Sequence, residues 1–193
     1  MVIILTSLLI LNFNQTDRSI KFTTTITAIT DLTNLKFFRV IDPDQDYNDY
    51  ETYTTYNYRG YDDTLPAKFY VYAVGPYSNW TIGLFSDLSL THNTGISEWW
   101  SVDPDFYLNE NNNGDGDNSI GIAFDLGDLN AGQSVTFGYA YVLGENPSVA
   151  ASAMISIPGS VFLLGTGLLS LVRIKIKQEE VLIFNHHKKH RHL

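Results

Sequence analysis

Residues 19–41 read SIKFTTTITAITDLTNLKFFRVI, and this stretch predicts β structure. Every second side chain of its first half falls on one face of an extended strand: Ile20, Phe22, Thr24, Ile26 and Ala28. After a turn at residues 31–34, apolar side chains resume at Leu35, Phe37 and Val40. The stretch therefore predicts a β-hairpin or a pair of strands.

Further short segments rich in Tyr, Thr, Val and Ile have the same character. They lie at residues 51–58, 67–74, 79–86, 118–125 and 133–143, with turn residues between them. No segment before residue 155 has a helical apolar period over three turns. The chain therefore predicts an all-β fold of roughly seven or eight strands, an antiparallel β-sandwich of the immunoglobulin-like or jelly-roll-like kind. A closed barrel is the alternative.

The first residues, MVIILTSLLILNF at positions 1–13, are apolar. One interpretation is a buried first strand, in a domain that has lost an upstream segment. The other is the hydrophobic core of a signal peptide. The strand is favoured, because no basic residue precedes the apolar stretch and no small-x-small cleavage site follows it.

Charge is unevenly distributed along the chain. Residues 1–154 hold 19 acidic and 6 basic side chains, a net charge of −13, whereas residues 155–193 hold 2 and 6, a net +4. An acidic body repels the phosphates of nucleic acid, so no nucleic-acid partner is expected. The chain has no cysteine, which excludes disulfides, thiol catalysis and Cys-ligated zinc.

An uncharged run of 18 residues, ISIPGSVFLLGTGLLSLV, occupies positions 155–172 and precedes a basic end. As a helix it spans about 27 Å, close to the roughly 30 Å of a bilayer core. Ten of its residues are Ile, Val, Leu or Phe, which favour insertion. Basic residues stay cytoplasmic, so the body is expected outside and the C-terminus inside. A buried core helix or strand is the alternative.

This run and its basic end resemble the C-terminal sorting signal of the PEP-CTERM family, in its VPLPA-type variant. The matching positions are Ile157, Pro158 and Gly159 in the proline motif, Gly165 and Gly167 in the helix, and Arg173, Lys175 and Lys177 in the basic end. The resemblance implies processing by an exosortase of Gram-negative bacteria. It also implies display at the outer surface, in species that make exopolysaccharide.

Four regions follow from these patterns. Residues 1–146 are expected to form the β-sandwich, 147–154 a linker, 155–177 the sorting helix and 178–193 a disordered basic, His-rich tail. Residues 32–46 also resemble strand-and-loop segments of bacterial adhesive sandwiches. The expected location is therefore the cell envelope, as a single-pass membrane protein that exosortase processing could release to the outer surface or the extracellular matrix.

Two acidic loops carry oxygen ligands at the alternating positions that calcium requires. The first offers Asp42, Asp44, Asp46 and Asn48, and the second offers Asn111, Asn113, Asp115 and Asp117. Neither loop has the acidic twelfth residue of a helix-loop-helix calcium site, because Tyr53 and Ile122 stand there. Calcium is thus one interpretation of both loops, and ordinary strand-linking turns are the other.

Aromatic and titratable residues give the remaining candidates. Trp99 and Trp100 are adjacent, so on a strand they would point to opposite faces, and an exposed indole could stack on a sugar. Core packing is the alternative. His92 is the only histidine before residue 155, where a loop position is expected, and no nucleophile motif accompanies it.

The expected protein is thus non-enzymatic and associated with the cell surface, a biofilm or exopolysaccharide. A carbohydrate-binding module that calcium stabilises is the alternative function.

Overall fold

A computed structural model describes residues 5–12 and 18–155 of the chain. This part contains nine strands: β1 (Leu5–Asn12), β2 (Ser19–Ala28), β3 (Leu32–Ile41), β4 (Tyr56–Arg59), β5 (Tyr70–Val74), β6 (Thr81–Phe85), β7 (His92–Ser97), β8 (Ser119–Leu129) and β9 (Ser134–Gly144). It also contains three helices: α1 (Tyr47–Tyr50), α2 (Pro104–Leu108) and α3 (Pro147–Ile155). The predicted all-β class is confirmed for these residues.

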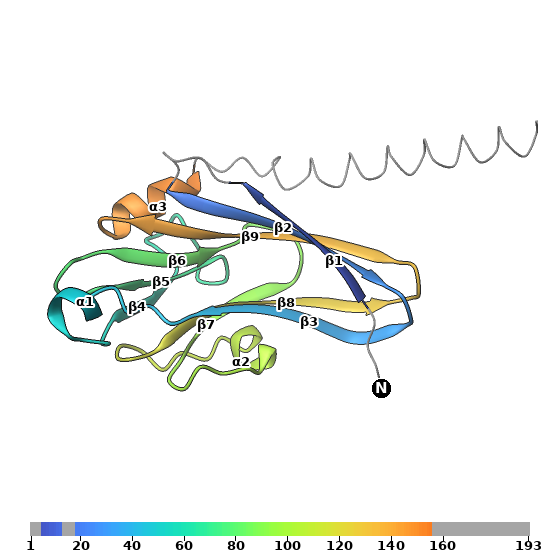
Figure 1. Cartoon of the computed structure of the whole chain (residues 1–193), viewed down its shortest axis with the longest axis horizontal. Coiled ribbons are helices and arrows are strands. Elements are labelled where there is room, and N and C mark those ends of the chain that lie inside the picture. The colour runs from blue at the N-terminus through green and yellow to red at the C-terminus, as the bar shows by residue number, and fades with distance from the viewer. Residues whose placement is uncertain (1–4, 13–17, 156–193) are drawn as a thin grey trace, which may run out of the picture. The chain divides into compact units, whose positions relative to one another are not determined.

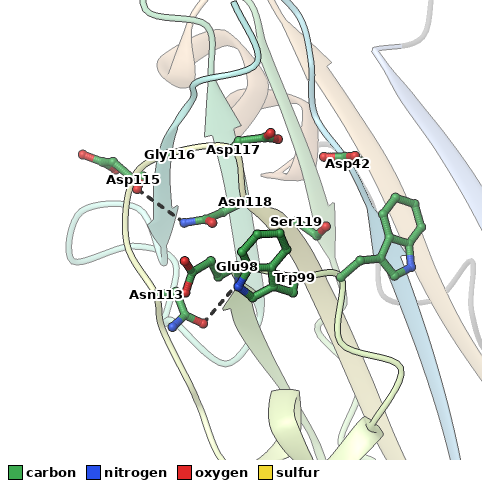
Figure 2. A pocket seen from close by; sticks show the side chains of 10 residues that line it. Asp42, Glu98, Trp99, Asn113, Asp115, Gly116, Asp117, Asn118 and Ser119 are labelled. Atoms are coloured by element: carbon green, nitrogen blue, oxygen red, sulfur yellow. Dashed lines mark hydrogen bonds between the residues drawn. The ribbon is translucent and has the colours of Figure 1, made fainter.

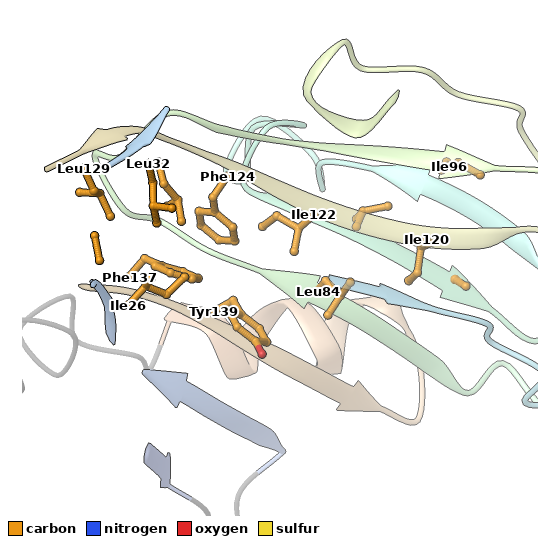
Figure 3. Close-up of a cluster of buried hydrophobic side chains, with 14 residues drawn as sticks. Ile26, Leu32, Leu84, Ile96, Ile120, Ile122, Phe124, Leu129, Phe137 and Tyr139 are labelled. Atoms are coloured by element: carbon orange, nitrogen blue, oxygen red, sulfur yellow. The ribbon is translucent and has the colours of Figure 1, made fainter. Parts of the chain in front are cut away.

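The strands form two antiparallel sheets (Figure 1). The larger sheet has the strand order β1-β2-β9-β6-β5-β4, and the smaller has the order β3-β8-β7. Apolar side chains from both sheets pack together between them (Figure 3). Two antiparallel sheets enclosing one core are the arrangement of a β-sandwich.

The core follows the alternation seen in residues 19–28. Thr24, Ile26 and Ala28 are buried, whereas the residues between them are partly exposed. At the centre, the Phe124 ring of the smaller sheet lies 5.1 Å from the Phe137 ring of the larger sheet, centroid to centroid. Such aromatic pairs add to the free energy gained by burial, so this contact ties the sheets to each other.

Residues 19–41 were predicted to form a β-hairpin or a pair of strands; both strands exist, but the hairpin is wrong because they do not pair with each other. Strand β2 pairs with β1 and β9, whereas β3 pairs with β8 in the other sheet. The turn between β2 and β3 therefore carries the chain from one sheet to the other. Alternation identifies the buried face of a strand, but it does not identify the neighbour to which the strand hydrogen-bonds.

Residues 5–12 form β1, which agrees with the strand interpretation of the N-terminal stretch. Strand β7, His92–Ser97, was missed because its sequence HNTGIS has Asn, Gly and Ser and no apolar alternation. It is a strand because it pairs with β8 over its whole length. Tertiary pairing here overrides local propensity.

Residues 147–154 were expected to be a linker, and this expectation is wrong because they lie within helix α3. Ala150, Ala151 and Met154 of α3 are buried, and Gly144 of β9 makes room for the helix. A Cβ atom on Gly144 would lie 2.5 Å from the backbone nitrogen of Ala150. Small residues, read as linker composition, in fact allow close packing of helix against sheet.

No helix in the described part of the chain is both long and apolar enough to cross a bilayer. The expected sorting helix at residues 155–177 and the tail at 178–193 lie outside the described residues, apart from Ile155 at the end of α3. The positions that resemble the sorting signal therefore also lie outside the described residues: Ile157, Pro158, Gly159, Gly165, Gly167, Arg173, Lys175 and Lys177.

Candidate functional site

A hollow of about 580 Å³ opens where three separate segments of the chain meet. One segment follows β3, one follows β7 and one precedes β8. The hollow is lined by Asp42, Glu98, Trp99, Trp100, Asn113, Asp115, Gly116, Asp117, Asn118 and Ser119 (Figure 2). It thus joins residues from both predicted calcium loops with both predicted glycan-binding tryptophans. Sequence reasoning offered no sign that these three segments meet.

Three carboxylates from the two loops lie close together beside this hollow. Asp42, Asp44 and Asp117 each offer an oxygen within 4.8 Å of the others. Burial, and then the charge of Asp117, raises the pKa of Asp42. Burial also raises the pKa of Asp44, with further contributions from Asp42 and Asp117. The three groups therefore repel one another when all are ionised.

One oxygen of this cluster lacks a partner. Asp44 Oδ1 is buried, and no hydrogen-bond donor among the described residues reaches it. A buried carboxylate oxygen without a donor is costly, and a hard cation such as calcium takes oxygen ligands of this kind. Asp42, Asp44 and Asp117 therefore offer oxygens of the type that calcium takes as ligands.

Asp46, the third predicted ligand of the first loop, has a different role. It is 1% exposed, and its carboxylate accepts hydrogen bonds from the backbone N–H groups of Tyr77 and Ser78. Burial opposes its ionisation, but the hydrogen bonds from Ser78 and Tyr77 outweigh burial and lower its pKa. Asp46 thus joins the first loop to the turn before β6. Asn48, the last predicted ligand of this loop, lies in α1.

The second predicted loop mainly closes one side of the sandwich. The N–H of Ile96 in β7 donates to the carbonyl of Asn111, and the N–H of Glu98 donates to Asn113 Oδ1. On the other sheet, the N–H of Asn57 in β4 donates to Asp115 Oδ1 at 2.8 Å. Residues 111–118, the closing loop, therefore cover the edges of both sheets. Unpaired edge strands favour aggregation, and this loop removes that exposure.

Only Asp117 of the closing loop joins the carboxylate cluster. Asp115, another predicted ligand, is outside the carboxylate cluster, and Asp115 and Asn113 each accept a backbone hydrogen bond. Their alternating spacing, which indicated calcium, also suits an irregular segment that pairs with two strand edges. The carboxylate cluster thus combines one residue of the second loop with two of the first.

Both tryptophans are exposed, so the core-packing interpretation is wrong. Trp99 is 85% exposed and Trp100 is 48% exposed. Trp100 has a φ of 50°, in the left-handed region that bulky side chains rarely adopt. Such backbone strain persists where the surroundings hold it in place, as they do at many binding sites.

Tyr107 of α2 holds the loop that carries these tryptophans in place. The Tyr107 side chain is fully buried, and its hydroxyl donates to the carbonyl of Ser101 at 2.8 Å. The N–H of Ser101 in turn donates to Ser97 Oγ at the end of β7. The start of α2 could have been read from Asp103 and Pro104, a capping side chain followed by a first-turn proline.

His92 lies in strand β7 and is buried, so the expected loop position is wrong. Its imidazole ring stacks against the rings of Phe69 and Phe124. Both ring nitrogens face backbone carbonyl oxygens, those of Leu90 and Ser86. The ring therefore packs within the fold and lies away from the residues that line the hollow.

The hollow also includes Glu98, Gly116, Asn118 and Ser119, which were not among the predicted site residues. The sequence did carry signals for three of them, since Glu98 directly precedes the tryptophan pair, and Gly116 and Ser119 stand at positions six and nine of the second predicted loop. No known family model matches this chain, and no curated protein is detectably similar to it.

Proposed function

We propose that this protein is a non-enzymatic, exported protein of a bacterial cell surface or extracellular matrix, and that its sandwich binds glycan in the hollow. The observation that carries the proposal is the presence of two adjacent exposed indoles, Trp99 and Trp100, beside a polar hollow. Sugars offer apolar C–H faces that stack on indole rings and hydroxyl groups that hydrogen-bond to amides and carboxylates. The hollow supplies both kinds of partner.

The position of the indoles supports this proposal. Exposing a Trp side chain forgoes the free energy of its burial, about 2–3 kcal/mol for a large apolar side chain. Here two neighbouring residues forgo it, and one of them also has a strained backbone. Tyr107 and Ser97 hold their loop through hydrogen bonds, which reduces the entropy lost on binding.

Attachment to the envelope is proposed from the sequence of residues 155–177. In this proposal the segment is a PEP-CTERM-like sorting helix in the membrane, the body is exported and the C-terminus is cytoplasmic. An exosortase is the proposed processing partner, and exopolysaccharide is the proposed ligand. The sandwich is proposed to be of the immunoglobulin-like or jelly-roll-like kind. Fractionation of cells with and without an exosortase tests the sorting step, because processing predicts a shorter, released form.

Calcium is proposed as a stabilising ion, held by Asp42, Asp44 and Asp117. The support is the grouping of these carboxylates and the unpartnered oxygen of Asp44. Melting of the full chain with calcium and with a chelator tests the proposal. Calcium should raise the melting temperature of the parent chain and leave that of Asp117→Asn unchanged. Coincident curves for the parent chain would show that the cluster does not take the ion.

Glycan binding is tested by titrating the full chain with bacterial exopolysaccharides and following tryptophan fluorescence. The sequence contains three tryptophans, and the third, Trp80, is also half-exposed but does not line the hollow. Trp99→Ala and Trp100→Ala should each weaken binding about tenfold or more, since stacking on an aromatic ring is worth roughly 1–3 kcal/mol.

Trp80→Ala is the matched control, because it removes an exposed indole outside the hollow. Its affinity should equal that of the parent chain. If no polysaccharide changes the tryptophan fluorescence of the parent chain, and none releases heat on mixing with it, the hollow does not bind glycan. Equal losses in all three variants would point to nonspecific adhesion by exposed aromatic rings.

A further inference from the structure

The charged side chains that line the hollow are all of one sign. Four of its ten residues are acidic, namely Asp42, Glu98, Asp115 and Asp117, and none is Lys, Arg or His. The described part of the chain contains three ion pairs, and their acidic partners are Asp105, Glu110 and Glu145. Among the described residues, the carboxylates of the hollow thus have no basic side chain as an ion-pair partner.

This charge lies next to aromatic surface. Glu98 is exposed and directly precedes Trp99, and the closing loop holds the Glu98 backbone through Asn113 Oδ1. Carboxylates favour a cation by Coulomb attraction, and an indole face favours the same cation through its quadrupole. The two kinds of residue therefore select for one feature of a ligand, which is positive charge.

The same charge disfavours the common acidic polysaccharides. A uronic-acid chain would bring carboxylates toward Asp42, Asp117 and Glu98, and like charges repel. A neutral sugar could stack on the indoles but would gain nothing from the carboxylates' charge. A sugar with a free, protonated amine would use the rings and the charge together.

We infer that the ligand of the hollow is an amine-bearing glycan, a chain that contains de-N-acetylated hexosamine; this inference rests on the glycan-binding function proposed above. The sugar rings stack on Trp99 and Trp100, and the ammonium groups face the carboxylates that Glu98 and Asp115 present. The hollow lies in the size range of small-ligand sites, so it holds a short stretch of such a chain.

The test measures by calorimetry the affinity of the full chain for four probes. A chelator is present, and the pH keeps the amine protonated. The probes are a glucosamine hexamer, an N-acetylglucosamine hexamer, a uronic-acid hexamer and pentalysine. The glucosamine hexamer should bind about tenfold more tightly than its acetylated form, and the uronic-acid hexamer most weakly. The advantage of the amine should shrink as salt is added, since the pairs are exposed.

Glu98→Gln provides the variant, because it removes one charge, keeps the shape and leaves the Asp42–Asp44–Asp117 cluster intact. It should weaken binding of the glucosamine hexamer about threefold, the size of one exposed ion pair, and leave the acetylated hexamer unaffected. Asp63→Asn is the matched control, since Asp63 is exposed and does not line the hollow. It should leave both affinities at the values of the parent chain.

The outcomes separate the two levels of the proposal. Equal affinity for the glucosamine and N-acetylglucosamine hexamers overturns the inference and leaves glycan binding standing. Absence of binding to every hexamer overturns both. Pentalysine that binds as tightly as the glucosamine hexamer, and does so equally in Trp99→Ala, shows that the hollow recognises charge without sugar and also overturns the inference.

Discussion

The hydroxyl of Tyr107 donates a hydrogen bond to the backbone carbonyl of Ser101, with 2.8 Å between the two oxygens. Tyr107 belongs to the short helix α2, and Ser101 directly follows the two exposed tryptophans. A fully buried ring thus holds the loop of two exposed tryptophans in place. The positions of the two tryptophans therefore depend on Tyr107, which does not line the hollow.

Tyr107→Phe should weaken both ligand binding and the fold. It removes one hydrogen bond, which is worth about 1 kcal/mol of unfolding free energy, and leaves the Ser101 carbonyl without this donor. The loop of Trp99 and Trp100 then loses its support, so affinity for a glycan probe should fall severalfold. Calorimetry and chemical denaturation measure the two effects. Unchanged affinity would mean that the loop is positioned by other contacts.

Gly121→Ala should destabilise the protein by about 1–3 kcal/mol through overpacking. The Tyr107 ring lies against the backbone of β8 at this point. A Cβ atom on Gly121 would be 2.6 Å from Tyr107 Cδ1, and neither the ring nor the strand can move freely in the core. Urea denaturation measures the loss. A variant as stable as the parent chain would show that Tyr107 packs less tightly than this geometry requires.

Asp46→Ala should destabilise the protein by about 1–3 kcal/mol, because the backbone N–H groups of Tyr77 and Ser78 lose their acceptor. Asp49→Ala is the control, since Asp49 is an exposed acidic residue of the neighbouring helix α1 and should change stability by at most about 0.5 kcal/mol. Thermal unfolding measures both variants. Equal effects would argue that the Asp46 contacts contribute no more than surface charge does.

Stability should fall steeply at alkaline pH. Burial raises the pKa of Tyr107 to about 12 and that of Tyr72 to about 12, whereas an unfolded tyrosine titrates near 10. Folding therefore favours the neutral phenols, and their contribution is complete below pH 10 and is lost as pH rises from 10 to 12. Denaturation at a series of pH values measures the slope, which Tyr107→Phe should reduce. A variant with the slope of the parent chain would contradict this assignment.

The sequence by itself determined the fold class and the faces of the strands. Alternation in residues 19–28 identified the buried side chains Thr24, Ile26 and Ala28, because side chains on a strand point to opposite faces in turn. The alternation did not determine which strands pair. Strands pair through backbone hydrogen bonds, and the side-chain pattern says little about which backbones meet. The separation of β2 and β3 into different sheets, and the existence of β7, were decided by tertiary pairing.

The candidate site divides in the same way. Residue types indicated the two acidic loops and the tryptophan pair, because oxygen spacing and adjacent indoles are visible in a linear chain. Only the tertiary structure brought Asp117 to Asp42 and Asp44, and placed all three segments around one hollow. In this structure Asp46 and Asp115 accept backbone hydrogen bonds and do not belong to the carboxylate cluster. The physical reason is that proximity between distant segments depends on how the sheets pack, and spacing along the chain does not encode that.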